Sequence, residues 1–248
     1  MNQFFLIILA VLPGFIITGY ILWRDRNEPE PLYLIAVCFV FGAISTYPAM
    51  KMEEFGMFDL YIINSPDILM TFTFAFLIVG FSEELMKYIF LRYYIYPKKE
   101  FSEPMDGIVY SVTISMGFAT LENILYIVLR TEDFNEALEI AYSRMLTAVP
   151  AHAAFSMTMG YFVGIAKTAP HKESLYLLCG LFGAVLLHGL YDFFIFQEMS
   201  KALTVFTFVT LGIALLAGKI MINKHSYFSS DKNKNFIDPD DENGNTES

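Results

Sequence analysis

Cysteine and basic residues are scarce in this 248-residue sequence, and each shortage excludes a class of protein. Its two Cys, Cys38 and Cys179, each lie inside an apolar run. A thiol in such a run behaves as a small apolar group, so neither a disulfide framework nor redox chemistry is indicated. The 26 Asp and Glu outnumber the 16 Lys and Arg, which gives a net charge of -10. Binding to nucleic acid is therefore not expected, because no basic face is available for phosphates.

Long apolar runs dominate the rest of the sequence. Hydrophobic residues make up 55% of the chain and 25 residues are Phe, which is far from the composition of a soluble domain. A helix needs about 20 mostly apolar residues to cross a bilayer. Runs of this length predict seven spans, at residues 4–23, 32–50, 66–94, 105–129, 145–166, 174–196 and 201–222. The predicted fold is all-α, a polytopic transmembrane helical bundle, because continuous runs lack the alternation of a membrane barrel.

The ends of the chain are interpreted from composition. The first apolar run has no basic residues before it and no small-residue cleavage site after it, so it is predicted to be a membrane helix rather than a signal peptide. Residues 1–225 are predicted to form one transmembrane domain. Residues 226–248 are rich in Asn and Asp and are predicted to be a disordered cytoplasmic tail, because they contain too few apolar residues to fold alone.

The distribution of Lys and Arg predicts the orientation of the chain. Cytoplasmic loops carry an excess of these residues. With seven spans, eleven of the 16 fall on one side, four fall on the other, and Lys87 is left inside the membrane. The N-terminus is therefore predicted to lie outside and the C-terminus in the cytoplasm.

Seven residues that can carry charge lie inside the predicted spans. They are Glu83, Glu84, Lys87, Glu122, His152, His188 and Asp192. A charged side chain at the centre of a membrane helix costs about 2.5–3.5 kcal/mol, so the five Glu, Asp and Lys residues together cost roughly 12–18 kcal/mol unless they are paired or neutral. This cost predicts that the groups face inward, pair with one another around a wet cavity, and serve a function.

Spacing places several of these groups on common helix faces. Lys87 follows Glu83 by four residues and Glu84 by three, so its ammonium can reach either carboxylate. His188 and Asp192 are also four apart, which lets the carboxylate orient the imidazole and favour its charged form. Two structural alternatives stay open: the acids and Lys87 could only fix helix register, and His152 could be a single interhelical hydrogen-bonding residue.

The available groups favour hydrolysis by an activated water. No Ser-His-Asp arrangement, paired-aspartate motif or H-E-x-x-H zinc motif is present. A Glu in an apolar site is a competent general base near neutral pH. Charged His188 and the amide of Asn123, which follows Glu122, could hold the oxyanion of a tetrahedral intermediate. Two alternatives remain: the same Glu and His residues could ligate zinc, or they could form the proton relay of a transporter or channel.

Four motifs resemble the PrsW family of intramembrane proteases, which is related to the CAAX-prenyl endopeptidases and bacteriocin-processing proteins. The motifs are S-E-E-L-M-K-Y from Ser82, G-F-A-T-L-E-N-I-L-Y from Gly117, P-A-H-A-A-F from Pro150 and L-H-G-L-Y-D from Leu187. The stretch W-R-D-R-N-E-P-E-P from Trp23 is similar to the first cytoplasmic loop of the family. Together the motifs extend in the expected order over most of the chain.

The resemblance implies a glutamate-type protease of the bacterial cell membrane that needs no metal or other cofactor. It implies that Glu83 and Glu84 are essential and that Glu122, His152 and His188 belong to the site. The spacing and chemistry described above add Lys87, Asn123 and Asp192 as supporting residues. It also implies a substrate, a single-pass anti-sigma factor that receives its site-1 cleavage on the extracytoplasmic side of the bilayer. CAAX-type relatives carry His where this chain has Glu122, so the general base stays open between Glu83, Glu84 and Glu122.

Overall fold

The computed structural model describes residues 2–58, 67–129, 131, 133–197 and 200–235, with side chains from residue 4 to residue 225. The elements are α1 (Asn2–Arg24), α2 (Leu32–Phe58), α3 (Ile68–Thr73), η2 (Phe74–Gly80), α4 (Phe81–Phe90), η3 (Leu91–Ile95), α5 (Pro104–Leu129), α6 (Phe134–Leu146), α7 (Ala148–Thr168), η4 (Pro170–Lys172), α8 (Glu173–Phe196) and α9 (Val205–Asn235). Every regular element is helical within the described residues. The predicted all-α class is therefore confirmed.

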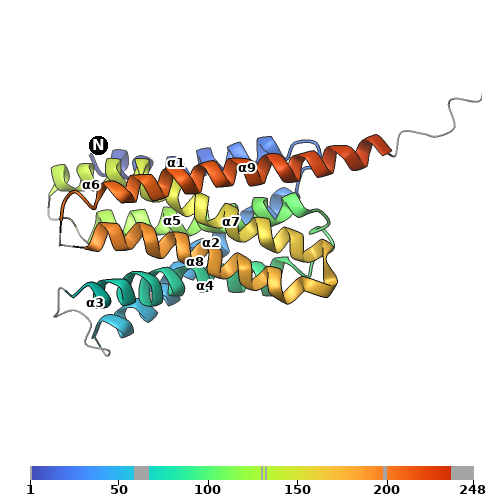
Figure 1. Cartoon of the computed structure of the whole chain (residues 1–248). Coiled ribbons are helices and arrows are strands. Elements are labelled where there is room, and N and C mark those ends of the chain that lie inside the picture. The colour runs from blue at the N-terminus through green and yellow to red at the C-terminus, as the bar shows by residue number, and fades with distance from the viewer. Residues whose placement is uncertain (1, 59–66, 130, 132, 198–199, 236–248) are drawn as a thin grey trace, which may run out of the picture.

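The long helices lie side by side along one axis (Figure 1). The segments α3, η2, α4 and η3 follow one another without a break and form a single rod. In Figure 1 the chain begins at one end of the bundle, and α9 extends beyond the other end. Such an arrangement needs an odd number of passes, as the prediction of seven spans requires.

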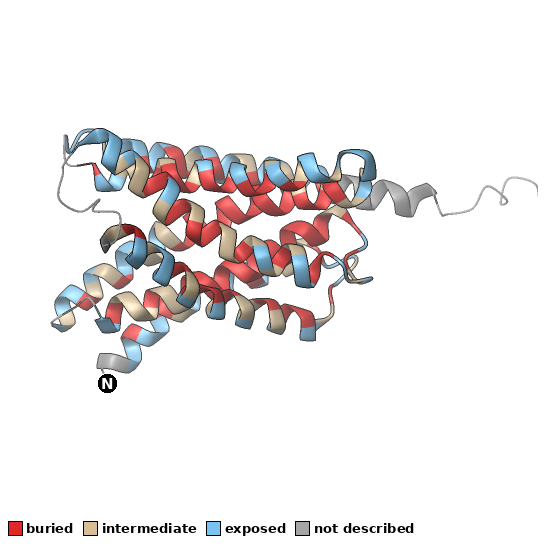
Figure 2. Ribbon diagram, turned by 90° about the horizontal axis from the view of Figure 1, so that it is seen from below, coloured by how far each residue is buried: buried red, intermediate tan, exposed pale blue. Residues whose placement is uncertain are grey.

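Six helices in the described part of the chain are long and apolar enough to cross a membrane. They are α1, α2, the rod from α3 to η3, α5, α8 preceded by η4, and α9. The predicted fifth span corresponds to α7, which does not meet the same criterion. α7 is buried along most of its length and packs against α5, α8 and α9, and Figure 2 shows that buried residues fill the interior of the bundle. A helix surrounded by protein rather than lipid can carry residues such as His152, Ser156 and Thr158.

The C-terminal helix is longer than predicted. The apolar span was expected to end near residue 222, yet α9 continues to Asn235, past the predicted domain boundary at residue 225. Extending an existing helix costs much less than nucleating a new one, so polar residues can continue it. The rest of the predicted disordered tail, residues 236–248, lies outside the described residues.

Glycines bring the two central helices, α5 and α7, into close contact. A Cβ added to Gly160 would lie 2.3 Å from the backbone oxygen of Gly107, and one added to Gly107 would lie 2.3 Å from the oxygen of Gly160. Small residues at such crossings let membrane helices pack backbone to backbone. Gly107 lies in the fourth predicted span and Gly160 in the fifth, so these two glycines are packing contacts between the spans.

We expect Gly160→Ala to destabilise the bundle by about 1–3 kcal/mol, because the new methyl group meets backbone that cannot move aside. The measurement is thermal unfolding of the purified protein in detergent. Gly212→Ala in α9 is the matched control, since a Cβ there has no atom within 4 Å. Its melting temperature should stay the same or rise slightly, as Ala favours a helix more than Gly does. Equal melting temperatures for the two variants would contradict the packing role of Gly160.

Candidate active site

Glu83 and Glu84 lie in the first turn of α4, directly after the π-helical turn η2. Both are buried, and Lys87 in the last turn of the same helix is buried with them. The Lys87 ammonium donates to Glu84 Oε1 over 2.8 Å and to Glu83 Oε2 over 3.3 Å. The predicted pairing along one helix face is therefore confirmed, and it includes both acids. Lys87 Nζ also lies 4.1 Å from the centre of the Phe118 ring.

The imidazole of His188, on α8, lies between carboxylates. Its Nδ1 is 2.9 Å from Glu84 Oε1, and its Nε2 is 3.3 Å from Asp192 Oδ2. The predicted pair of His188 and Asp192 is confirmed. Contact between both ring nitrogens and carboxylates favours the charged imidazolium.

Close backbone packing places His188 next to α4. A Cβ on Gly80, the residue before α4, would lie 3.2 Å from the backbone nitrogen of Gly189. On the other side, a Cβ on Gly189 would lie 2.3 Å from the ring of Phe76. Because these two residues are glycines, α8 lies close enough to the rod for His188 to contact Glu84.

His152, on α7, connects this cluster to Glu122 on α5. Its Nδ1 is 3.3 Å from Lys87 Nζ, and its Nε2 is 3.0 Å from Glu122 Oε2. His152 is therefore not an isolated hydrogen-bonding residue. The rings of His152 and His188 meet edge to face, with their centroids 5.3 Å apart.

Asn123 and Glu122 have a partner that the sequence analysis missed. Arg144 was expected in a loop outside the membrane, but it lies near the end of α6 and its guanidinium is mostly buried. Arg144 donates to Glu122 Oε2 over 2.6 Å and to Asn123 Oδ1 over 2.7 Å. Arg144 stands in a short helix that is too polar to read as a span, so nothing in the sequence pointed to this contact.

The position of Asn123 does not support its expected role. Its amide nitrogen donates to the backbone oxygen of Ala10, on α1, over 3.4 Å. Both ends of the amide are thus used to hold Arg144 and α1, rather than aimed at the Glu83 cluster. The expectation that Asn123 holds an oxyanion stays a prediction. Asn123 follows Glu122 directly, so it is turned by about 100° around the helix and faces other partners.

One further acid approaches the site from α2. Glu53 lies within electrostatic range of Glu83, Glu122 and Asp192. Residue 53 was placed in a polar loop after the second predicted span, whereas α2 continues to Phe58. The longer helix brings this carboxylate beside the cluster.

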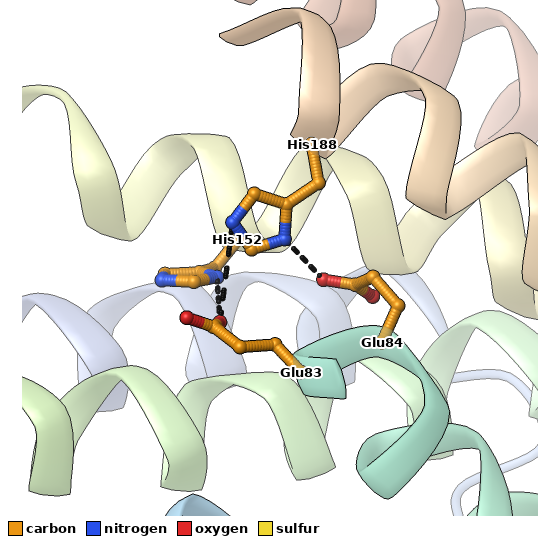
Figure 3. Close-up of side chains that lie close together, drawn as sticks. All are labelled: Glu83, Glu84, His152 and His188. Atoms are coloured by element: carbon orange, nitrogen blue, oxygen red, sulfur yellow. Dashed lines mark hydrogen bonds and ion pairs between the residues drawn. The ribbon is translucent and has the colours of Figure 1, made fainter. Parts of the chain in front are cut away.

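Four of the predicted site residues converge. A carboxylate oxygen from Glu83 and from Glu84 and a ring nitrogen from His152 and from His188 all lie within 4.8 Å of one another. Figure 3 shows the two imidazoles facing the two carboxylates, with Glu83 near both rings. Glu122 joins the cluster through His152. The predicted gathering of acids and imidazoles from separate spans is confirmed.

Comparison with known proteins agrees with this geometry. The model of the PrsW family intramembrane metalloprotease matches residues 30–217, most of the chain. The chain belongs to the PrsW family of intramembrane proteases. It is 37% identical to Protease PrsW of Geobacillus kaustophilus over 197 residues, which cover 79% of this chain and 82% of that protein. No solved structure matches the chain.

Two other PrsW relatives show how far the similarity extends. Protease PrsW of Bacillus subtilis is 33% identical over 193 residues, covering 77% of this chain and 83% of that protein. Protease PrsW of Clostridioides difficile is 31% identical over 235 residues, covering 94% of each. This PrsW chain is therefore a multi-pass membrane protein and a peptide hydrolase.

The description of the PrsW family as metalloproteases raises the question whether the four residues fit a metal. Two carboxylates and two imidazoles are ligands that zinc accepts, and their donor atoms are close enough to share one ion. In addition, Glu84 Oε2 is buried without a hydrogen-bond partner. The donor set therefore fits a metal. When bound, such an ion would supply Lewis acidity that activates a water.

Lys87 competes with a metal for the same atoms. Its ammonium contacts Glu83 Oε2, Glu84 Oε1 and His152 Nδ1 at 2.8–3.3 Å. A metal bound by these three atoms would be repelled by the ammonium unless Lys87 moved away or lost its proton. In this PrsW site the Lys87 ammonium thus already lies among the atoms that would ligate a metal.

Proposed function

We propose that this chain is a glutamate-type intramembrane endopeptidase in which Glu83 activates the attacking water. The observation that carries the proposal is the buried cluster of Glu83, Glu84, His152 and His188, gathered from α4, α7 and α8. Membership of a protease family favours hydrolysis over the proton relay of a transporter or channel. In this proposal the general base and the groups around the attacking water are all side chains of this protein.

The hydrogen bonds of the three candidate acids support Glu83 as the base. Glu84 Oε1 is held by both Lys87 and His188. Glu122 Oε2 is held by Arg144 and His152. Glu83, by contrast, has a single long hydrogen bond from Lys87 within the described residues. Glu83 therefore has the carboxylate that can most readily accept a proton from water.

The two imidazoles lie where a reacting peptide would need donors. His152 Nδ1 and His188 Nε2 are each 3.9 Å from Glu83 Oε2. This separation is too long for a direct hydrogen bond, so neither ring holds Glu83 Oε2 as firmly as His188 holds Glu84. We assign the stabilisation of the oxyanion to His188 Nε2, which must leave Asp192 Oδ2, 3.3 Å away, to donate to it, because Nδ1 is held by Glu84.

The proposed reaction balances with these groups. The water oxygen forms a bond to the peptide carbonyl carbon while one water proton passes to Glu83. The negative charge on the carbonyl oxygen is stabilised by His188. The C–N bond then breaks, and the proton on Glu83 passes to the amine leaving group. The remaining proton of the former water passes from the new carboxylic acid to the amine. The products are therefore a carboxylate and an ammonium group, and Glu83 returns to its charged form.

A metal-dependent protease is the second candidate. The fit of the four donors and the unpartnered Oε2 of Glu84 favour it. In that version His152 and His188 would hold the ion with Glu83 or Glu84, and Lys87 would have to move away or lose its proton.

For the substrate we propose a single-pass anti-sigma factor of a bacterial cell membrane, cut at site 1 on its extracytoplasmic side. The resemblance of the motifs implies this class. The orientation that supports it has the N-terminus outside and the C-terminus in the cytoplasm, with eleven of the 16 Lys and Arg on the cytoplasmic side. The start of α1 and the end of α9 lie at opposite ends of the bundle, which is consistent with this orientation.

The test is cleavage of a candidate anti-sigma factor by the purified protein in liposomes, with the new ends identified by mass spectrometry. We expect one cut on the extracytoplasmic side of the substrate helix, unaffected by a chelator and without stoichiometric zinc in elemental analysis. Loss of cleavage on chelation, restored by zinc, would replace the glutamate-type mechanism with the metal-dependent one. Substrate-dependent proton flux without proteolysis would refute the protease.

A further inference from the structure

A second group of acids lies at the other end of α5, away from the active site. Asp25 and Glu30 belong to the loop between α1 and α2, and Asp106 lies in the first turn of α5. One carboxylate oxygen from each lies within 4.8 Å of the others. Asp106 precedes Glu122 by about 24 Å along the helix, at 1.5 Å per residue. The group is thus separate from the cluster around Glu83.

The three carboxylates are buried. Asp25 and Glu30 are each 8% exposed, and Asp106 is 2% exposed. Among the residues that the structure describes, Asp25 Oδ2 is buried and has no hydrogen-bond partner. A buried carboxylate oxygen without a partner is costly, so this atom indicates that something outside the protein completes the site.

Local hydrogen bonds hold the other two acids in place. Asp106 Oδ2 accepts from the backbone nitrogens of Ser102 over 2.7 Å and Glu103 over 2.8 Å, which caps the start of α5. Glu30 Oε2 accepts from the hydroxyl of Tyr110, one turn further along α5. The carboxylates are therefore fixed in position before any ligand binds.

The surrounding charges are negative. Burial first, then the charges of Asp106, Glu103 and Glu28, raise the pKa of Asp25 to about 8. Lys167 is a cation within electrostatic range of Asp106. Its ammonium, however, donates to the backbone oxygen of Tyr96 over 2.6 Å. The negative charges of the acids therefore repel one another, and Lys167 neutralises little of that charge because its ammonium is bound to Tyr96.

We propose that Asp25, Glu30 and Asp106 bind a hard divalent cation of the Mg²⁺ or Ca²⁺ class. Oxygen-only donors suit these ions, whereas zinc prefers the imidazoles of the active site. The ion joins the loop after α1 to the start of α5. Both α1 and α2 pack against α5, so one ion at this end fixes three helices relative to one another.

The experiment uses Tb³⁺, a luminescent probe of calcium-type sites, with the full-length protein in detergent. Tyr110 is in contact with Glu30 and serves as the antenna that excites the bound ion. We expect saturable luminescence at one equivalent, displaced by Mg²⁺ or Ca²⁺. The identity of the more effective competitor assigns the ion.

Asp25→Asn and Glu30→Gln should each weaken Tb³⁺ binding by at least about tenfold. Glu139→Gln, which removes an exposed acid from α6, is the matched control for net charge. Glu84→Gln tests whether the signal comes from the active site, and binding should persist in it. Ion-dependent protection of wild-type protein against heating provides a second readout if either variant fails to fold.

The proposal would be overturned if wild-type protein bound no Tb³⁺ saturably, or if binding survived Asp25→Asn and Glu30→Gln unchanged. It would also be overturned if Glu84→Gln abolished the signal. Absence of saturable Tb³⁺ binding would mean that the cluster simply shares protons. Glu30 and Asp106 are close enough to hydrogen-bond when one of them is protonated.

Discussion

Glu83→Gln is expected to lower kcat for peptide cleavage by about 10²–10⁴-fold, the usual contribution of a general base. Gln keeps the size of the side chain and its hydrogen bond to Lys87, but it cannot accept the proton of the water. KM should therefore change little. The measurement is initial rates of substrate cleavage in liposomes, with the melting temperature of each variant recorded alongside.

Two variants separate this role from the others in the cluster. Glu139→Gln removes an exposed acid of α6 and should leave the rate unchanged. Glu122→Gln removes an acid that Arg144 and His152 already hold, so it should affect stability more than Glu83→Gln does. A full rate in Glu83→Gln protein, together with loss of rate in Glu122→Gln protein, would assign the base to Glu122 instead.

Lys87→Met is expected to reduce the free energy of unfolding by about 3–5 kcal/mol, because it leaves buried carboxylates without their cation. The Lys87 side chain is 1% exposed and contacts both Glu83 and Glu84. Met has a similar length and no charge, so the loss would come from charge rather than from volume. The measurement is reversible unfolding in detergent, and cleavage should be lost as well.

A double variant tests the physical cause. Lys87→Met combined with Glu84→Gln removes one positive and one negative charge, so it should recover part of the lost stability. Cleavage should not return, because the neutral amide at position 84 can accept from His188 but no longer favours its charged form. The double variant could instead lose more free energy of unfolding than the two single variants lose together. In that case the stabilising role of Lys87 could not be an ion pair with Glu84.

The parts of the site that lie within one helix were predictable. Helical spacing alone brings Lys87 to Glu83 and Glu84, and His188 to Asp192, because residues three and four apart share a face. The cost of charge in a bilayer also predicted that these groups would face inward. The spacing was informative because the backbone of a helix is regular.

The contacts between helices were less predictable. The bond from Arg144 to Glu122 connects α6 to α5, and the sequence placed Arg144 in a loop. Asn123 follows Glu122 in the chain, yet it faces α1 and Arg144. The rotation of each helix about its axis decides these contacts, and packing sets that rotation. Neighbouring positions in sequence therefore point to different partners.

The sequence by itself determined that this chain is a helical membrane protein with a PrsW-type set of Glu and His residues. Apolar runs can satisfy their backbone in lipid only as helices, and the spacing of charges along each run follows from the helical repeat. Only the tertiary structure decided that Glu84 is held by His188, that Glu83 stays available, and that Asp25 meets Glu30 and Asp106. Those arrangements depend on how close two helices come. Gly80 and Gly189, which have no Cβ, permit the close approach of α8 to the rod.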